Sequence, residues 1–261
     1  MADLTTAEAE KIINSVAIPP RPAIVNAVLE ERAKAEPNLR RIAQLVSTDV
    51  GLAAAVLKTI NSPFFGLRRQ VSSIDHAVSM LGMKNIGALV MSLSLRNAVP
   101  TQGLDRFWDE AARTALVAAY LAQTLGCVPK EDAHLFGLFR DAGIPLLMRR
   151  FSDYRDTLKL ANSELTASFT EVEDGRHGTN HAVVGYFLAR RWHLADVIAE
   201  GVLHHPDYRV LTEPGRVSDA VRRLISVCVR AEHIIRLNGR GTRDHEWSKA
   251  AESACVCLGL S

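Results

Sequence analysis

The sequence predicts an all-α protein built as a two-lobed helical bundle. Apolar residues recur at spacings of three and four along most segments, which is the period of one face of a helix. No stretch of strand length alternates between apolar and polar residues. The turn-forming run from Pro100 to Gly103 is the clearest boundary in the chain. We therefore expect a first lobe over residues 1–100 and a second lobe over residues 104–261.

Helix-capping residues divide the first lobe into short helices. Pro22 suits the first turn of a helix, because its ring fixes a helical φ and its missing N–H is not needed there. Asn38, Asp49 and Ser73 belong to the residue types whose side chains cap helix N-termini. The expected helices span residues 22–34, 39–47, 50–60, 74–82 and 85–99.

Longer helices are expected in the second lobe. Gly126 is placed to end the first of them, and Thr179 to cap a later one. The first helix carries Trp108 and then small residues at spacings of four and three, which favours close helix packing; the small residues are Ala112, Ala115, Ala119 and Ala122. The helices that follow are expected over residues 131–140, 146–160, 180–192, 194–205 and 217–235.

Composition and charge exclude several classes of protein. The 261 residues are 48% hydrophobic and 23% charged, which is ordinary for a globular protein and excludes a disordered or collagen-like chain. The 31 basic and 29 acidic side chains leave a net charge of +2. The overall charge therefore gives no reason to expect a strongly anionic partner.

The N-terminal residues and the cysteines favour a cytoplasmic location. The first residues lack the basic start and apolar run of a signal peptide, and no segment is apolar enough for a membrane helix. The 4 cysteines contain no CxxC pair, so they do not predict a zinc hairpin. We expect reduced thiols in a cytoplasmic protein.

Histidines and carboxylates gather in the second lobe. Five of the 9 histidines fall between His177 and His205. Imidazole nitrogens and carboxylate oxygens suit Zn, Mn or Fe, so this clustering is compatible with a metal site. Residues of these types at helix ends also serve as caps or stay solvated, and spacing alone favours that structural interpretation.

The first lobe resembles the HDOD family, the HD-related output domains of bacterial signalling proteins. The resemblance covers residues 15–240 and rests on phrases that occur in the family's order. These phrases are Ile18-Pro19-Pro20-Arg21-Pro22, Leu45-Val46-Ser47-Thr48-Asp49, Asn61-Ser62-Pro63-Phe64-Phe65-Gly66 and Leu81-Gly82. They imply a stand-alone HDOD protein.

The second lobe resembles a degenerate HD-superfamily domain. That superfamily carries a phrase like Gly-Leu-Leu-His-Asp-Ile-Gly-Lys, and residues 137–144 read Gly-Leu-Phe-Arg-Asp-Ala-Gly-Ile. Thr114 and Arg140 stand where active HD phosphohydrolases hold histidine ligands. An arginine has no free lone pair for a metal, and its charge would repel a cation. Any residual metal site would use the remaining residues, which are Asp141, His181, His204, His205 and Glu232.

The resemblance implies a pseudoenzyme, so we expect no catalytic residues, no metal and no cofactor. The expected role is a signalling or regulatory module that contacts other proteins, without a membrane. A guanidinium at position 140 would pair with Asp141 or Glu232 and turn the site into a salt-bridged remnant. The first alternative is a metal-dependent HD-type phosphohydrolase with an unusual ligand set.

The second alternative is a nucleic-acid-binding regulator. Residues 39–61 have the look of a helix-turn-helix, but the second helix offers bases only Lys58, Thr59 and Asn61. We therefore expect no binding of nucleic acid through this segment.

An arginine-rich helix face is a further candidate surface. Four arginines of the last long helix could contact an anion or an acidic partner, since guanidinium groups suit phosphate and carboxylate. The structural alternative is a solvated helix face. These residues are Arg222, Arg223, Arg230 and Arg236.

Overall fold

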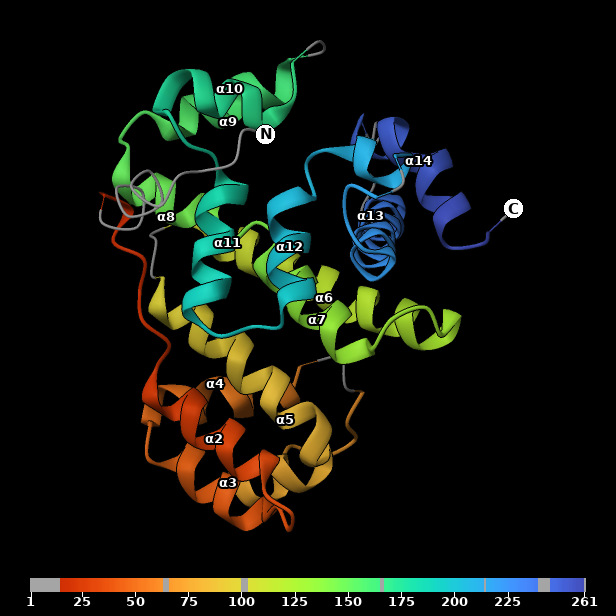
Figure 1. The fold of residues 1–261 in the computed structure, drawn as a ribbon. Helices are drawn as coiled ribbons and strands as arrows, with labels where there is room; N and C mark the ends of the chain where they lie inside the picture. The colour runs from red at the N-terminus through yellow and green to blue at the C-terminus, as the bar shows by residue number, and fades with distance from the viewer. Residues whose placement is uncertain are drawn as a thin grey trace. The chain divides into compact units, whose positions relative to one another are not determined.

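A computed structural model describes residues 15–62, 66–99, 103–164, 167–213, 215–238 and 245–260 (Figure 1). Helices and their connections make up this described part, which contains no strand, so the predicted all-α class is confirmed. Contacts group the chain into two compact units. One unit is Pro20–Pro100, and the other joins Thr101–Ser261 with the N-terminal residues up to Pro19.

Side-chain caps start three of the four helices of the first unit, as predicted. Asn38 accepts a hydrogen bond from the backbone N–H of Arg40 at 2.9 Å, and Asp49 accepts one from Leu52 at 2.9 Å. The hydroxyl of Ser73 accepts a third, from the N–H of His76. These bonds satisfy N–H groups that have no partner within their own helix. The helices are α2 (Ala23–Ala33), α3 (Leu39–Ser47), α4 (Val50–Ile60) and α5 (Ile74–Ala98).

Gly82 bends α5. The sequence predicts two helices on either side of this residue, and the structure runs them together across a kink at Gly82 with φ 70° and ψ 171°. A side chain is strained at such a positive φ, whereas glycine adopts it readily. The predicted break is therefore real, but it is a kink within α5.

Asn61 holds the connection that follows α4. Its side-chain amide donates to the carbonyl oxygen of Val71 at 2.8 Å and accepts from the N–H of Val71 at 2.8 Å. This pair of bonds ties the end of α4 to Val71; Pro63, Phe64 and Phe65, between them in the sequence, lie outside the described residues. The Asn61 of the family phrase thus has a structural role.

The exposed face of α4 offers little to nucleic acid. Thr59 donates its hydroxyl to the carbonyl of Ala55 at 2.8 Å, and Asn61 is held by the loop. Of the three polar residues considered for base contacts, Lys58 is the exposed one. Val50, at the start of the helix, is 82% exposed and apolar. Direct reading of base edges needs several donors and acceptors, and this helix lacks them.

The second unit contains most of the helices. Gly126 ends α6 in the left-handed conformation, with φ 61°, as predicted. The bounds are α6 (Asp105–Leu125), α7 (Lys130–Phe139), α8 (Gly143–Arg150), α9 (Tyr154–Ser163), α10 (Phe169–His177), α11 (His181–Arg191), α12 (Asp196–His204), the short 3₁₀ helix η2 (Tyr208–Leu211), α13 (Asp219–Asn238) and α14 (His245–Cys257).

Three predictions about helices in this unit are wrong. The single helix expected over residues 146–160 is two, because Phe151 is extended and separates α8 from α9. Asn180 rather than Thr179 caps α11, since the Asn180 side chain accepts from the N–H of Val183 at 3.0 Å. Two helices, α10 and α14, were not expected. Local patterns do not place these boundaries, because tertiary contacts help to decide where each helix ends.

Residues 15–19 belong to the second unit, whereas the sequence assigns them to the first lobe. Arg149 donates a hydrogen bond to the carbonyl oxygen of Ala17 at 2.7 Å. The indole N–H of Trp192 donates to the carbonyl oxygen of Pro19 at 3.1 Å. These contacts hold the segment against α8 and the end of α11.

The described helices and the cysteines agree with the absence of a membrane helix and of disulfides. No single described helix is long and apolar enough to cross a membrane; two bent pairs, α3 with α4 and the two halves of α5, would meet the length and composition criteria only in combination. All four cysteines are free thiols. Burial raises the pKa of the Cys228 thiol far above its usual value.

Glycines allow the helices of the second unit to approach closely. A Cβ at Gly137 would lie 2.9 Å from the Cα of Ala115, so this glycine lets α7 pack against the backbone of α6. A Cβ at Gly143 would overlap the carbonyl oxygen of His181 and lie 2.8 Å from its carbonyl carbon. Gly143 thereby brings the start of α8 against the start of α11.

We predict that Gly143→Ala lowers the stability of the second unit by about 3 kcal/mol, because backbone rather than a flexible side chain must move. Chemical unfolding followed by tryptophan fluorescence measures this, since Trp108, Trp192 and Trp247 all lie in this unit. Gly175→Ala in α10 is the matched control. Nothing lies within 4 Å of its Cβ position, so we expect a gain of about 0.5–1 kcal/mol. Equal stability of the two variants would contradict the prediction.

We also predict that His134 makes the unit less stable as the pH falls. Burial lowers the pKa of His134 to about 4, and a hydrogen bond with the backbone of Ala115 opposes this only in part. The unfolded chain binds a proton near pH 6.5, so the free energy of unfolding decreases below that pH, by about 2 kcal/mol between pH 7 and pH 5. His134→Gln should lose this part of the pH dependence. Identical pH profiles of the two proteins would refute it.

Candidate functional site

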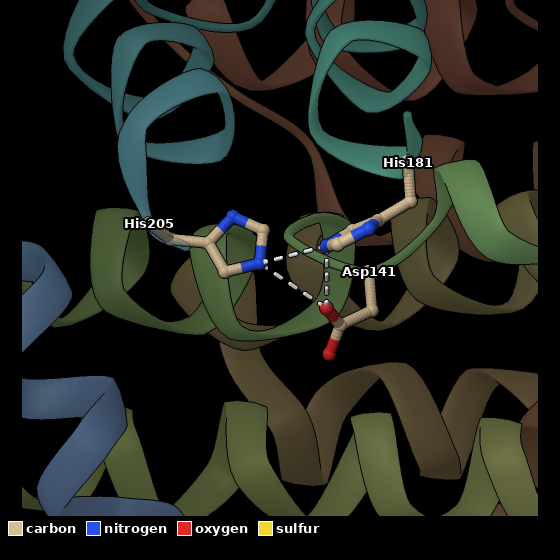
Figure 2. A group of neighbouring side chains, drawn as sticks. All are labelled: Asp141, His181 and His205. Atoms are coloured by element: carbon tan, nitrogen blue, oxygen red, sulfur yellow. Dashed lines mark hydrogen bonds and ion pairs between the residues drawn. The ribbon is translucent and has the colours of Figure 1, made fainter. Parts of the chain in front are cut away.

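Three side chains from separate helix ends converge in the second unit (Figure 2). Asp141 lies in the turn between α7 and α8, His181 opens α11, and His205 follows α12. His205 Nε2 lies 3.2 Å from Asp141 Oδ1 and 3.4 Å from His181 Nε2. His181 Nε2 lies 3.8 Å from the same Asp141 oxygen. These three atoms form a small triangle, which we call the Asp-His-His triangle.

Glu173 fixes the imidazole of His181 from behind. The Nδ1 of His181 lies 2.6 Å from Glu173 Oε2, and the same carboxylate oxygen accepts from the backbone N–H of His181 at 3.3 Å. The hydroxyl of Tyr154 donates to the other oxygen of Glu173. Because a carboxylate only accepts, Nδ1 of His181 carries the hydrogen, and Nε2 is turned toward Asp141.

The backbone fixes His205 in a similar way. Its Nδ1 lies 2.8 Å from the carbonyl oxygen of Val202 and therefore donates to it. In the neutral ring, Nε2 then holds a lone pair. With both imidazoles neutral, the triangle brings together two nitrogen lone pairs and a carboxylate oxygen, with no hydrogen between them. One proton or one cation would satisfy this arrangement.

The surroundings shift the pKa values of His181 and His205 in opposite directions. Burial alone would lower the pKa of His181, but the charge and hydrogen bond of Glu173, with the charge of Asp141, raise its pKa above the usual value. Burial lowers the pKa of His205, and the hydrogen bond and charge of Asp141 only partly oppose this. These opposite shifts favour the charged form of His181 over that of His205.

Arg140 pairs with both carboxylates at the edge of the site. Its guanidinium donates to Asp141 Oδ2 at 2.7 Å and to a carboxylate oxygen of Glu232 on α13. The side chains of Arg140, Asp141 and Glu232 are 14%, 25% and 19% exposed. Asp141 thus turns one oxygen toward the histidines and the other toward the arginine. The ion pairs that the sequence predicts for Arg140 are present in the structure.

These ion pairs shift the pKa values of the groups involved. Burial opposes the charged form of Arg140, but Asp141 and Glu232 raise its pKa well above the usual value. Burial would raise the pKa of Asp141, but Arg140 and then His205 lower it far below the usual value. Burial raises the pKa of Glu232 more than Arg140 lowers it. Asp141 therefore stays ionised at neutral pH.

Three of the sequence candidates lie outside the triangle. Glu232 contacts Arg140 and does not meet the histidines. His204 is half-buried, and its Nδ1 is buried with no hydrogen-bond partner in the described structure. Thr114 is buried on α6, where its backbone lies against Gly137.

Arg222 and Arg230 of the predicted arginine face have partners within the unit. Arg222 donates to the carbonyl of Leu211 at 2.7 Å and pairs with Asp219 at 3.1 Å. Arg230 lies over the ring of Trp247, 5.2 Å from its centroid. Arg223 and Arg236 are exposed. The four arginines therefore do not form one free cationic face.

The donor set of the triangle suits a divalent cation. Two imidazoles and a carboxylate are ligands that Zn, Mn and Fe accept. A tetrahedral zinc with bonds of about 2.0–2.1 Å separates its ligand atoms by about 3.3 Å, and the three separations in the triangle lie near that value. Both histidines are also held through Nδ1 by a second group, which is typical of metal-binding histidines. Asp141, His181 and His205 are therefore the residues that could hold such an ion.

Sequence reasoning missed Glu173 and Tyr154. Glu173 lies in the acidic run Glu171-Val172-Glu173-Asp174, which is typical of an exposed helix face. It is nevertheless fully buried, because α10 folds back on α9 and α11. Tyr154 opens α9, a helix whose start was not predicted. No motif in the sequence marks either residue as part of the site.

Solved structures with this fold cover nearly the whole chain. A candidate phosphohydrolase of Shewanella amazonensis matches with a TM-score of 0.73 and 22% identity, over 95% of this chain and 88% of that one. An HDOD domain protein of unknown function from Geobacter sulfurreducens matches with a TM-score of 0.71 and 22% identity, over 97% of this chain and 90% of that one. A candidate signal transduction protein of Marinobacter aquaeolei matches with a TM-score of 0.70 and 21% identity, over 96% of this chain and 55% of that one.

Curated relatives and a family model give the assignment. An uncharacterized protein of Treponema pallidum is 26% identical over 190 residues, which is 70% of this chain and 37% of that protein. The uncharacterized protein YuxH of Bacillus subtilis is 30% identical over 70 residues, which is 27% of this chain and 17% of that protein. The chain thus spans well under half the length of these relatives. The model of the HDOD domain matches residues 18–208, and the chain belongs to the HDOD domain family.

Proposed function

We propose that this HDOD protein is a non-catalytic signalling or regulatory module that acts by contacting other proteins. The observation that carries this proposal is the double ion pair of Arg140 with Asp141 and Glu232. It places a permanent positive charge beside the candidate cation site and occupies the carboxylate of Glu232 and one of the two oxygens of Asp141.

The charge of Arg140 and the small number of available ligands both support this proposal. A guanidinium about 4 Å from a unit positive charge repels it by about 4 kcal/mol at an effective dielectric constant of 20. Glu232 is also turned to Arg140, so its carboxylate does not belong to the Asp-His-His triangle. A second metal ion, as used in many phosphohydrolases, has no ligand set of its own among the described residues.

The fold is compatible with both a signalling and a hydrolytic role. Proteins that share it at 21–22% identity are named as a candidate phosphohydrolase and as a candidate signal transduction protein. Because one fold hosts many functions, the site has to decide between them.

A metal-dependent phosphohydrolase is the second candidate function, and the convergence of Asp141, His181 and His205 favours it. A cation held by these residues would supply Lewis-acid polarisation and an activated water. The residues themselves would bind and orient that ion, with Asp141 shared between the ion and Arg140.

We predict that the protein hydrolyses neither phosphate monoesters nor phosphate diesters. Tag-free protein is loaded with Zn, Mn or Fe, dialysed and tested with p-nitrophenyl phosphate and bis-p-nitrophenyl phosphate, with elemental analysis alongside. The expected rate equals that of the metal-only blank. His181→Ala and His204→Ala form a matched pair, because both remove an imidazole and only His181 belongs to the triangle.

Hydrolysis that is lost in His181→Ala and kept in His204→Ala would overturn the non-catalytic proposal and support the second candidate. Metal binding that is lost in His181→Ala and kept in His204→Ala, without any hydrolysis, would indicate a cation site in a non-catalytic module.

We further predict that Arg140→Met lowers the stability of the second unit by about 2–3 kcal/mol, because two mostly buried carboxylates lose their partner. Tryptophan fluorescence during urea unfolding at pH 7 measures this loss. The double variant Arg140→Met/Glu232→Gln should recover part of it, since one of the two charges is then absent. Arg209→Met is the control: this arginine pairs with Asp207 at the surface, so its loss should cost less than about 1 kcal/mol. Equal losses for the two arginines would contradict the role given to Arg140.

A further inference from the structure

We propose that Glu173, held in place by Tyr154, is the positioning residue of a divalent-cation site formed by Asp141, His181 and His205. This inference rests on the cation site of the second candidate function, not on hydrolysis.

The carboxylate of Glu173 is shared between His181 of the site and Tyr154. It is fully buried in the second unit, where an unpaired carboxylate would be strongly unfavourable. Its hydrogen-bond donors are the Tyr154 hydroxyl and the backbone and ring N–H groups of His181. No arginine or lysine is among them, although a buried carboxylate is commonly paired with one. The fixed charge of Glu173 is therefore directed at His181.

That charge changes what His181 can bind. Donation of the Nδ1 hydrogen to a carboxylate orients the ring and makes the opposite nitrogen a stronger donor to a metal. His205 has only the neutral carbonyl of Val202 behind it. Of the two imidazoles, His181 is consequently the one whose affinity for a cation depends on an ionised side chain.

The charge of Glu173 also offsets that of Arg140. With neutral imidazoles, the buried cluster contains one guanidinium and the carboxylates of Asp141, Glu173 and Glu232, so its net charge is about −2. One divalent cation would balance this charge. Without Glu173, the net charge is halved to about −1. Less negative charge then offsets the repulsion between Arg140 and the cation.

Glu173 and Tyr154 link the site to the α9–α10 helix pair. Tyr154 opens α9, and Glu173 lies on α10; both helices lie together at one end of the unit (Figure 1). The pair is joined further by Thr157 with His177, at 2.8 Å, and by the ion pair of Asp153 with Arg176, at 3.0 Å. A cation bound to His181 would therefore strengthen the hydrogen bonds of Glu173 with His181 and Tyr154, which join α9 and α10 to the site.

The experiment compares zinc affinity among four proteins by competition with a chromophoric zinc chelator. Wild type should bind one zinc ion per chain, and His181→Ala should bind none. Glu173→Gln keeps the size and an acceptor oxygen but removes the charge, so we expect zinc to bind about 10- to 100-fold more weakly. Glu31→Gln is the matched control: Glu31 is also a buried carboxylate that accepts from a backbone N–H, that of Asn38, but it lies in the other unit. Its zinc affinity should equal that of wild type.

Hydrogen exchange provides a second readout that a purely structural role would not change. Zinc should slow exchange in residues 154–177 of wild type, and this effect should be lost in Glu173→Gln at the same zinc concentration. If Glu173→Gln does not fold, Tyr154→Phe replaces it, with an expected weakening of zinc binding within about tenfold.

The outcomes separate the two ideas. Absence of zinc binding by wild type would overturn the cation site and this inference together. Zinc binding by wild type that is lost in His181→Ala but unchanged in Glu173→Gln, or in Tyr154→Phe where that variant is used, would overturn the inference alone and make Glu173 a structural residue.

Discussion

The ion pairs of Arg140 with Asp141 and Glu232 allow the second unit to keep two carboxylates largely out of water. Burying an ionised group has a large unfavourable desolvation free energy. Opposite charges and hydrogen bonds around the group are needed to offset it. Arg140 does this from the end of α7, with one neighbour in the next turn and the other on α13. The same contact fixes the second oxygen of Asp141 and so decides which oxygen faces the histidines.

The positions of these charges depend in turn on close backbone packing. Asp141 can face His181 because the start of α8 lies directly against the start of α11 at Gly143. Burial and charge then act together: Asp141 stays ionised beside Arg140, and His181 gains basicity from Glu173. The site is thus built from helix ends, where side chains and unpaired backbone groups are both available.

Much of the fold could be predicted from the sequence, because caps such as Asn38, Asp49 and Ser73 act on their own helices. Asp141, His181 and His205 were among the candidates through the resemblance to HD domains. The choice of His205 over His204 could not be predicted, since adjacent residues at a helix end differ by about 100° in direction and the phase depends on packing. Glu173 was missed for a related reason: its contact with His181 joins two helices, and nothing in the local acidic run signals burial.

Arginine and a metal ion supply positive charge in different ways, and this bears on the function. The charge of Arg140 is covalently fixed, whereas a cation in the triangle would come and go with its concentration. Hydrolysis needs an ion that stays bound with an open position for substrate and water. The charge of Arg140 lowers the affinity of the three-ligand site for a cation, whereas the charge of Glu173 behind His181 raises it. In the cation site that we propose, binding and release of the ion would be transmitted through Glu173 to the α9–α10 pair.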